Sequence, residues 1–159
     1  MAKTQKTNAV RLLEAAKVPF STRTYPVDEE HLDAQHVADA LAEDINCVFK
    51  TLVLRGERTG LFVCVVPGNC EVDLKKAAHA AGDKKVEMIA MKELLPTTGY
   101  IRGGCSPVGM KKALPTYFHS SATDFDTIYV SAGVRGMQLE INPADLIAFV
   151  GASVADLVK

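Results

Sequence analysis

The residue whose position most needs a chemical explanation is Lys50, which lies within a run of apolar, β-forming residues at 47–54. An ammonium group buried without a partner costs free energy, so this lysine should face a water-filled cavity or a carboxylate. In a cavity, Lys50 would be a cationic anchor for an anionic or carbonyl-bearing ligand. Alternatively, it is an edge-strand lysine that points to water and prevents edge-to-edge association. The local sequence alone favours the edge-strand interpretation.

A glycine-rich segment at 97–110 contains four glycines and one proline, so its backbone is shaped by turns. Consecutive backbone N–H groups in such a loop can cradle a phosphate or an oxyanion. At Gly103 and Gly104 the backbone could approach a ligand most closely, because glycine has no side chain. The segment matches neither GxxxxGK[ST] nor GxGxxG, so it is not typical of a nucleotide-binding loop. A tight structural loop explains its composition equally well.

Two further polar residues lie at the ends of predicted strands. Ser131 precedes a second glycine-containing turn, 131–136, and could donate a hydrogen bond to a bound amine or ester. The commoner role of a serine at such a position is to stabilise the turn itself. Tyr25 ends a strand beside Pro26, where it could line the mouth of a pocket or be a core aromatic with one hydrated end.

Nucleophilic and metal-assisted chemistry receive little support from the sequence. No serine lies in a G-x-S-x-G elbow. Cys47 and Cys105 could be nucleophiles, but no feature indicates a lowered thiol pKa at either position. The four cysteines form no CxxC pair and no histidine lies beside them at metal-ligand spacing, so we expect reduced thiols in a cytoplasmic protein, and neither metal nor cofactor. Any ester chemistry would then depend on positioning and on stabilisation of an oxyanion.

The composition limits the partners of the chain. Its 159 residues, 48% of them hydrophobic and 23% charged, predict a single globular domain, 1–159. A formal net charge of -1 gives no overall attraction to nucleic acid or to an anionic membrane, so RNA binding would need a local patch or a partner. No apolar run is long enough for a membrane span. Residues 1–10 carry charge with no apolar core after them, so we expect no signal peptide.

The remaining segments predict the elements that position these residues. Apolar periodicity and capping residues predict helices over 7–17, from 34 after the cap Asp33, over 73–81, over 91–95 before Pro96, and from Asn142-Pro143 onwards. Runs of β-forming residues predict strands over 20–25, 47–54, 61–66, 86–89, 115–120, 127–132 and 137–141. Because the strands mostly arrive as hairpins, we expect an α/β (α+β) fold with a curved, mixed or antiparallel sheet of about six or seven strands flanked by helices.

Four stretches, in this order and at suitable spacing, resemble the YbaK/EbsC family, which is related to the editing domain of prolyl-tRNA synthetase. They are residues 49–52, 98–109, 128–136 and 140–146. The resemblance extends from about residue 8 to the end of the chain. It implies a barrel-like mixed sheet surrounded by helices, and a trans-editing enzyme that removes a wrongly attached amino acid from tRNA.

Three details are similar to the Cys-tRNA(Pro) deacylase branch of that family: Tyr25-Pro26, the Gly-Gly-x-Ser-Pro loop and the Ser-x-Gly-x-Arg-Gly turn. This branch implies removal of Cys from the acceptor ends of tRNA(Pro) and tRNA(Cys). Because proteins that bind tRNA unaided need several phosphate contacts and this chain is nearly neutral, we expect prolyl-tRNA synthetase as the partner that confers tRNA choice. A reaction in which the substrate's own thiolate attacks its ester would need no protein nucleophile. A deacylase for Ala-tRNA(Pro) or another aminoacyl-tRNA, and a non-enzymatic protein that binds nucleotides or RNA acceptor ends, stay open as alternatives.

The resemblance also implies roles for individual residues. Lys50 matches the family's essential lysine, near the phosphate or carbonyl region of the terminal adenosine. Gly103 matches a glycine whose N–H lies near the reacting carbonyl, and Ser131 matches a serine near the substrate amino group. The implied substrate-binding positions are Tyr25, Thr51, Gly104 and Asp145. Asp145 also fits a carboxylate that stabilises the first turn of a helix.

Overall fold

The computed structural model describes residues 6–159. Residues 1–5 lie outside the described part, and with them the first half of the segment 1–10 on which the signal-peptide expectation is based. Its α-helices are α1 (Asn8–Ala15), α2 (Ala34–Leu41), α3 (Leu74–Ala81), α4 (Met91–Thr98) and α5 (Pro143–Val150), and its 3-10 helices are η1 (Ile45–Cys47) and η2 (Ser120–Asp124). Its strands are β1 (Phe20–Thr24), β2 (Phe49–Gly56), β3 (Gly60–Pro67), β4 (Val86–Met88), β5 (Thr116–His119), β6 (Ile128–Ser131), β7 (Met137–Ile141) and β8 (Ser153–Ala155).

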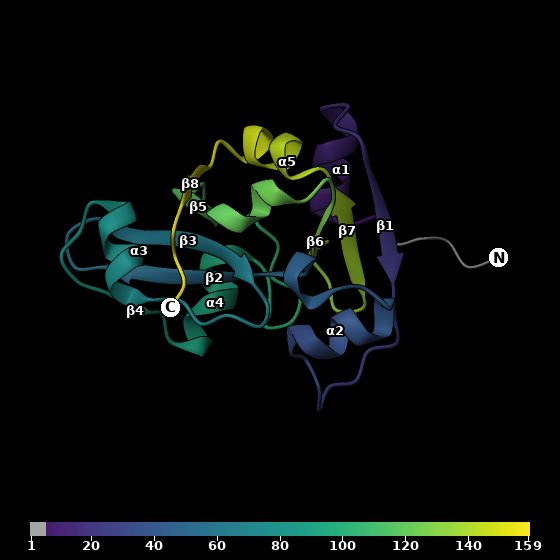
Figure 1. Cartoon of the computed structure of the whole chain (residues 1–159), viewed down its shortest axis with the longest axis horizontal. Coiled ribbons are helices and arrows are strands. Elements are labelled where there is room, and N and C mark those ends of the chain that lie inside the picture. Colours follow the sequence, from purple (N-terminus) through teal and green to yellow (C-terminus); the bar gives the residue numbers. More distant parts are fainter. Residues whose placement is uncertain (1–5) are drawn as a thin grey trace.

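The strands form two sheets (Figure 1). A three-stranded antiparallel sheet has the order β1-β7-β6, and a five-stranded mixed sheet has the order β4-β2-β3-β5-β8. The α/β class and the mixed pairing are confirmed. The expected single barrel-like sheet is divided instead, and the two sheets do not close into a barrel. An isolated parallel bridge between Val48 and Tyr129 links them.

Most helix ends follow the capping signals of the sequence. Asp33 accepts a hydrogen bond from the His36 N–H at the start of α2, and Asn142 accepts one from the Asp145 N–H at the start of α5. The expected end of the helix at Pro96 is wrong, because α4 continues to Thr98. Its last turn is held by the Thr98 hydroxyl, which donates to the Leu94 carbonyl at 2.7 Å.

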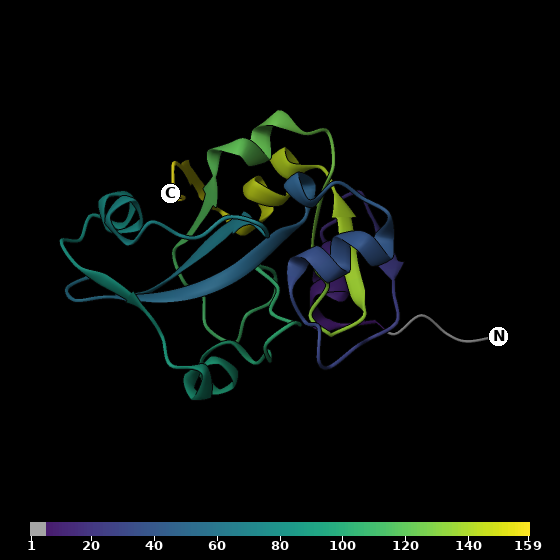
Figure 2. The same ribbon diagram turned by 60° about the horizontal axis from the view of Figure 1, so that its bottom comes forward.

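The largest apolar cluster lies where the two sheets meet α1 and α5. Figure 1 shows the three-stranded sheet with α1 and α2 at one end of the molecule, and the β2–β3 hairpin with α3 at the other. In the view of Figure 2, α2 lies in front of the three-stranded sheet, and its buried residues share an apolar cluster with Tyr129 of β6. Within residues 6–159, no helix is both long and apolar enough to span a membrane.

A polar network fixes α2 and the segment after it to the three-stranded sheet. Arg23 of β1 donates to the Leu41 carbonyl at 2.9 Å and forms ion pairs with Glu43 and Glu140 at 3.2 and 3.3 Å. The Tyr129 hydroxyl lies 3.0 and 2.9 Å from the same two carboxylates. These contacts matter for function because the N-terminal turn of α2 borders the cavity described next.

Candidate active site

A cavity of about 330 Å³ lies at the junction of the two sheets. Its walls come from β2, the start of α2, the β4–α4 segment, the glycine-rich loop and the ends of β6 and β7. Lys50, Thr51, Gly103 and Ser131, which are far apart in the sequence, all line it. The structure therefore brings together four of the seven site residues expected from the sequence.

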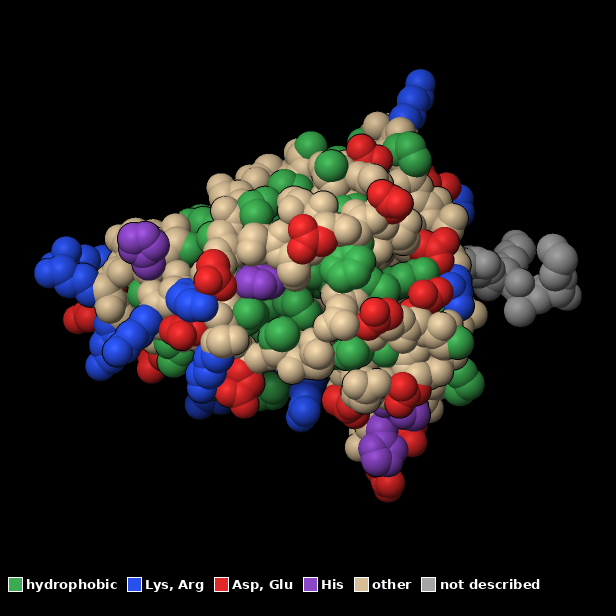
Figure 3. All heavy atoms as spheres, in the orientation of Figure 1, with side chains coloured by type: hydrophobic (Ala, Val, Ile, Leu, Met, Phe, Trp, Pro, Cys, Tyr) green, Lys and Arg blue, Asp and Glu red, His purple; other side chains and the backbone are tan. Residues whose placement is uncertain are grey.

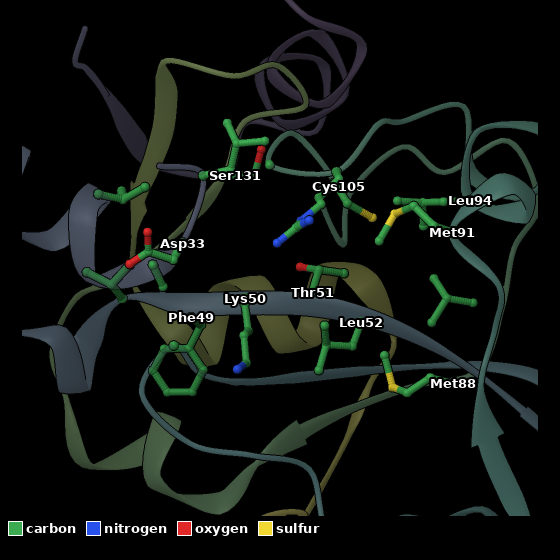
Figure 4. A pocket seen from close by; sticks show the side chains of 18 of the residues that line it. Asp33, Phe49, Lys50, Thr51, Leu52, Met88, Met91, Leu94, Cys105 and Ser131 are labelled. Atoms are coloured by element: carbon green, nitrogen blue, oxygen red, sulfur yellow. The ribbon is translucent and has the colours of Figure 1, made fainter. Parts of the chain in front are cut away.

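Lys50 and Thr51 lie next to each other on β2, so their side chains point to opposite faces of the strand. Figure 4 shows the Lys50 amine on one side of β2 and the Thr51 hydroxyl on the other, the side that holds Ser131 and Cys105. Lys50 is half-buried and forms no ion pair with any residue of 6–159. It is thus an uncompensated cation at the wall of the cavity.

Two groups in the loop that follows β3 act electrostatically on the Lys50 amine. Burial is the largest influence and lowers the pKa of Lys50, while Cys70 and Glu71 act in the opposite direction. A partly desolvated ammonium interacts more strongly with an incoming anion than one in water. This position suits contact with a phosphate or a developing negative charge at the cavity wall.

In the glycine-rich loop, Gly103 and Gly104 have different environments. Gly103 has a φ of +84°, a left-handed conformation that favours glycine, and its N–H donates to no group within residues 6–159. Gly104 is buried and its N–H donates to the Ile101 carbonyl at 2.9 Å. A Cβ on Gly104 would lie 3.1 Å from the backbone nitrogen of Arg135, so glycine permits this close packing. Of these two glycines, only Gly103 borders the cavity.

The turn after β6 supports the glycine-rich loop. Arg135 donates from its Nε to the Arg102 carbonyl at 2.8 Å, and this bond connects the two glycine-containing segments. In the same turn, the Gly133 N–H donates to the Ser131 hydroxyl at 3.1 Å. Ser131 therefore stabilises its own turn, as the commoner interpretation expects, and also faces the cavity.

Gln138 is a cavity residue that the sequence did not reveal. It lies opposite Ser131 in the β6–β7 register, so both side chains point to the same face of the sheet. The residue is only 5% exposed, yet its side-chain Oε1 has no hydrogen-bond partner in the described chain. The Thr51 hydroxyl is also buried without a partner. Buried polar atoms without a partner are rare in folded proteins, so each of these two oxygens calls for an explanation.

The other two expected contacts lie away from this cavity. Tyr25 contributes to a small depression beside it, together with Gly103 and Arg135. Asp145 is exposed in the first turn of α5 and is not part of either wall. Its position is the one expected for a carboxylate that stabilises a helix N-terminus.

Cys105 is the only cysteine among the residues that line the cavity, and Figure 4 shows it facing Met91 and Leu94. Burial is the main reason that its pKa rises to about 11, so at neutral pH it is a thiol and a poor nucleophile. We predict that Cys105→Ala leaves the rate of ester cleavage at this cavity within about threefold of the original, because a protonated thiol is not an activated nucleophile. Initial rates with an aminoacyl-tRNA ester, the substrate class that the family resemblance implies, check this. A loss of about 100-fold or more in a folded variant would mean that the thiol takes part.

Comparison with known proteins agrees with this geometry. Residues 28–149 match the model of the aminoacyl-tRNA editing domain. The chain belongs to this family of editing domains, the YbaK family. Within residues 6–159, the editing domain contains no cluster of His, Cys, Asp or Glu that could hold a metal ion.

Individual relatives resemble this editing domain over most of its length. It is 50% identical to "Putative Cys-tRNA(Pro)/Cys-tRNA(Cys) deacylase EbsC" of Enterococcus faecalis over 153 residues, which is 96% of this chain and 93% of that protein. A crystal structure described as a "putative trans-editing enzyme for prolyl tRNA synthetase" shares 26% identity, with a TM-score of 0.83 over 98% of this chain and 99% of that one. A proline--tRNA ligase of Fervidobacterium nodosum is 33% identical over 78 residues, 49% of this chain and 13% of the ligase.

Proposed function

We propose that this editing domain removes Cys from mischarged Cys-tRNA(Pro), and from Cys-tRNA(Cys) as well. The observation that carries the proposal is the 50% identity to EbsC along 96% of the chain. The convergence of Lys50, Thr51, Gly103 and Ser131 on one cavity supports it, because these are the positions that the family resemblance assigns to substrate.

The proposed reaction uses the substrate's own sulfur. The cysteinyl thiolate attacks the ester carbonyl carbon, a C–S bond forms, and the C–O bond to the ribose breaks. The ribose oxygen leaves and takes up, through water, the proton that the thiol lost, and the amino acid leaves as a strained thiolactone that water later hydrolyses. Holding the reacting atoms about 3–3.5 Å apart supplies much of the lowering of the barrier. An enzyme of this kind needs no activated nucleophile, and Cys105, the cysteine at the cavity, is not one.

The cavity residues have matching roles in this reaction. The free N–H of Gly103 stabilises the oxyanion that forms at the carbonyl, an effect worth about 3–4 kcal/mol for one well-placed donor. Ser131 and Gln138 accept hydrogen bonds from the substrate's α-ammonium group, which satisfies the unpaired oxygen of Gln138. Lys50, on the other side of β2, contacts the phosphate of the terminal nucleotide.

The charge distribution bears on how tRNA is held. Figure 3 shows Lys and Arg side chains gathered at the end of the molecule formed by α3, β4 and the β2–β3 turn. The exposed residues of this end include Arg58, Lys75, Lys84 and Lys85. The whole chain has a net charge of -1, so there is no overall attraction to RNA and tRNA binding would depend on the few phosphate contacts of this patch. We therefore propose that prolyl-tRNA synthetase supplies the selection of tRNA(Pro).

The decisive test is deacylation of a substrate panel by the purified protein. We expect rapid release of Cys from Cys-tRNA(Pro) and Cys-tRNA(Cys) alone, and a preference for Cys-tRNA(Pro) when prolyl-tRNA synthetase is present. Alanyl and seryl esters of the same tRNAs should be inert, because neither carries a thiol.

The panel also separates the alternatives. Cleavage of Ala-tRNA(Pro) as fast as Cys-tRNA(Pro) would reject the thiol mechanism and identify a broader deacylase. RNA binding without ester cleavage would identify a non-enzymatic acceptor-end binding protein. Equal rates on both Cys-tRNAs, with and without synthetase, would reject the proposed partnership.

A further inference from the structure

The edge of β2 beside the cavity has no partner strand along its middle. β3 pairs with β2 along 49–56 on one side. On the other side, β4 pairs only with 54–56, and the bridge at Val48 closes the opposite end. Within the described residues, 49–52 therefore form an open edge, and all four of them line the cavity. Backbone groups on an open edge are available to a ligand.

Two hydrogen bonds show which backbone groups face the open edge. The Gly68 N–H donates to the Val48 carbonyl at 2.8 Å on the β3 side, and the Ile89 N–H donates to the Val53 carbonyl at 3.3 Å on the β4 side. Because the backbone groups of successive residues alternate between the two edges, those of residues 49, 51 and 53 point away from β3. The Val53 carbonyl is already bonded to Ile89, so residues 49 and 51 are left at the open edge. The Phe49 carbonyl and the Thr51 N–H thus form an acceptor beside a donor.

The walls around this edge are apolar on two sides. Met88, Met91 and Leu94 line one side of the cavity, and Leu32 and Val37 line another. An anion would need donors only, whereas this edge alternates acceptors with donors. A flat heteroaromatic ring with a donor next to an acceptor matches both the polar edge and the apolar walls. Adenine has such an edge, formed by its N6 amino group and N1.

We propose that the open edge of β2 binds the base of the substrate's 3′-terminal adenosine. The N6 amino group donates to the Phe49 carbonyl, and N1 accepts from the Thr51 N–H. This inference rests on the proposed function, because that adenosine carries the amino acid. The occupant is a nucleobase and not an extended peptide, since the open stretch of four residues is enclosed in a cavity of about 330 Å³.

The test replaces single atoms of the terminal adenosine in Cys-tRNA(Pro). We expect purine riboside, which lacks the N6 amino group, and 1-deazaadenosine, which lacks N1, each to lower kcat/KM about tenfold. 7-Deazaadenosine keeps both groups and should react like adenosine. Equal rates for all four nucleosides would overturn this inference while leaving the proposed deacylase intact. No cleavage of the natural Cys-tRNA(Pro) would instead reject the proposed function.

A matched set of variants tests the protein side. Thr51→Pro removes an N–H that faces the open edge, so the ladder with β3 keeps its hydrogen bonds. We expect this variant to lose the penalty for 1-deazaadenosine while keeping the penalty for purine riboside. Thr51→Val removes the hydroxyl but keeps the backbone N–H. It should keep the losses of kcat/KM with both purine riboside and 1-deazaadenosine. If folded Thr51→Pro still distinguishes 1-deazaadenosine from adenosine, the Thr51 N–H does not read N1. If Thr51→Pro does not fold, the nucleoside series decides alone.

Discussion

Replacement of Lys50 by alanine is expected to lower kcat/KM for Cys-tRNA(Pro) by about 100-fold or more. The lysine is the half-buried cation at the cavity wall, and its charge has no ion-pair partner in residues 6–159. A substrate phosphate would therefore gain a contact with a partly desolvated charge, which the variant lacks. Because the folded protein makes no ion pair with this amine, circular dichroism and thermal unfolding should show an intact fold.

Lys112→Ala is the matched control, since Lys112 is exposed, does not line the cavity and is not part of the basic patch at the α3 end. It should leave the rate within about twofold of the original, as expected for a solvated lysine. Lys50→Arg keeps the charge and should retain part of the activity. Activity of Lys50→Ala within about threefold of the original would show that the lysine is only a solubilising group on the strand.

Gln138→Met is expected to separate activity from stability. The substitution keeps the length of the side chain but removes a buried carboxamide whose oxygen has no partner. Unfolding free energy should stay constant or rise by about 1 kcal/mol, because an unsatisfied buried polar group is destabilising. The KM for Cys-tRNA(Pro) should rise about tenfold, because the α-ammonium group loses an acceptor. Chemical denaturation and steady-state kinetics measure the two effects.

Ser121→Ala provides the comparison, because the Ser121 hydroxyl is also buried without a partner but lies in η2, away from the cavity. This substitution should change the free energy of unfolding by a similar amount and leave the kinetics with Cys-tRNA(Pro) unchanged. If Gln138→Met destabilises the protein and leaves KM unchanged, the carboxamide has a structural role and does not contact substrate.

The sequence predicted local structure well where a side chain acts on its own neighbours. Asp33 and Asn142 were expected as helix caps and both accept the first backbone N–H groups of their helices. The β2–β3 hairpin follows from two apolar runs separated by a short polar loop. The residue pattern singled out Lys50, Gly103 and Ser131, and the family resemblance added Thr51. The fold brings all four to one cavity.

Features that depend on distant pairing were not accessible in the same way. Gln138 looked like an ordinary strand residue, and only its place opposite Ser131 brings it to the cavity. The short strand β8 is held by parallel pairing with β5, and its three residues show no alternation of apolar and polar types. The division into two sheets was also missed, because strand patterns do not record which strands become neighbours.

The location of the cavity at a seam has an evolutionary consequence. The proposed amino-acid contacts, Ser131 and Gln138, belong to one sheet, while the proposed nucleotide contacts belong to β2 of the other. Single substitutions in the three-stranded sheet can therefore change which amino acid is selected. Recognition of the tRNA terminus, if made by main-chain atoms of β2, is shielded from such changes because every residue except proline supplies the same amide.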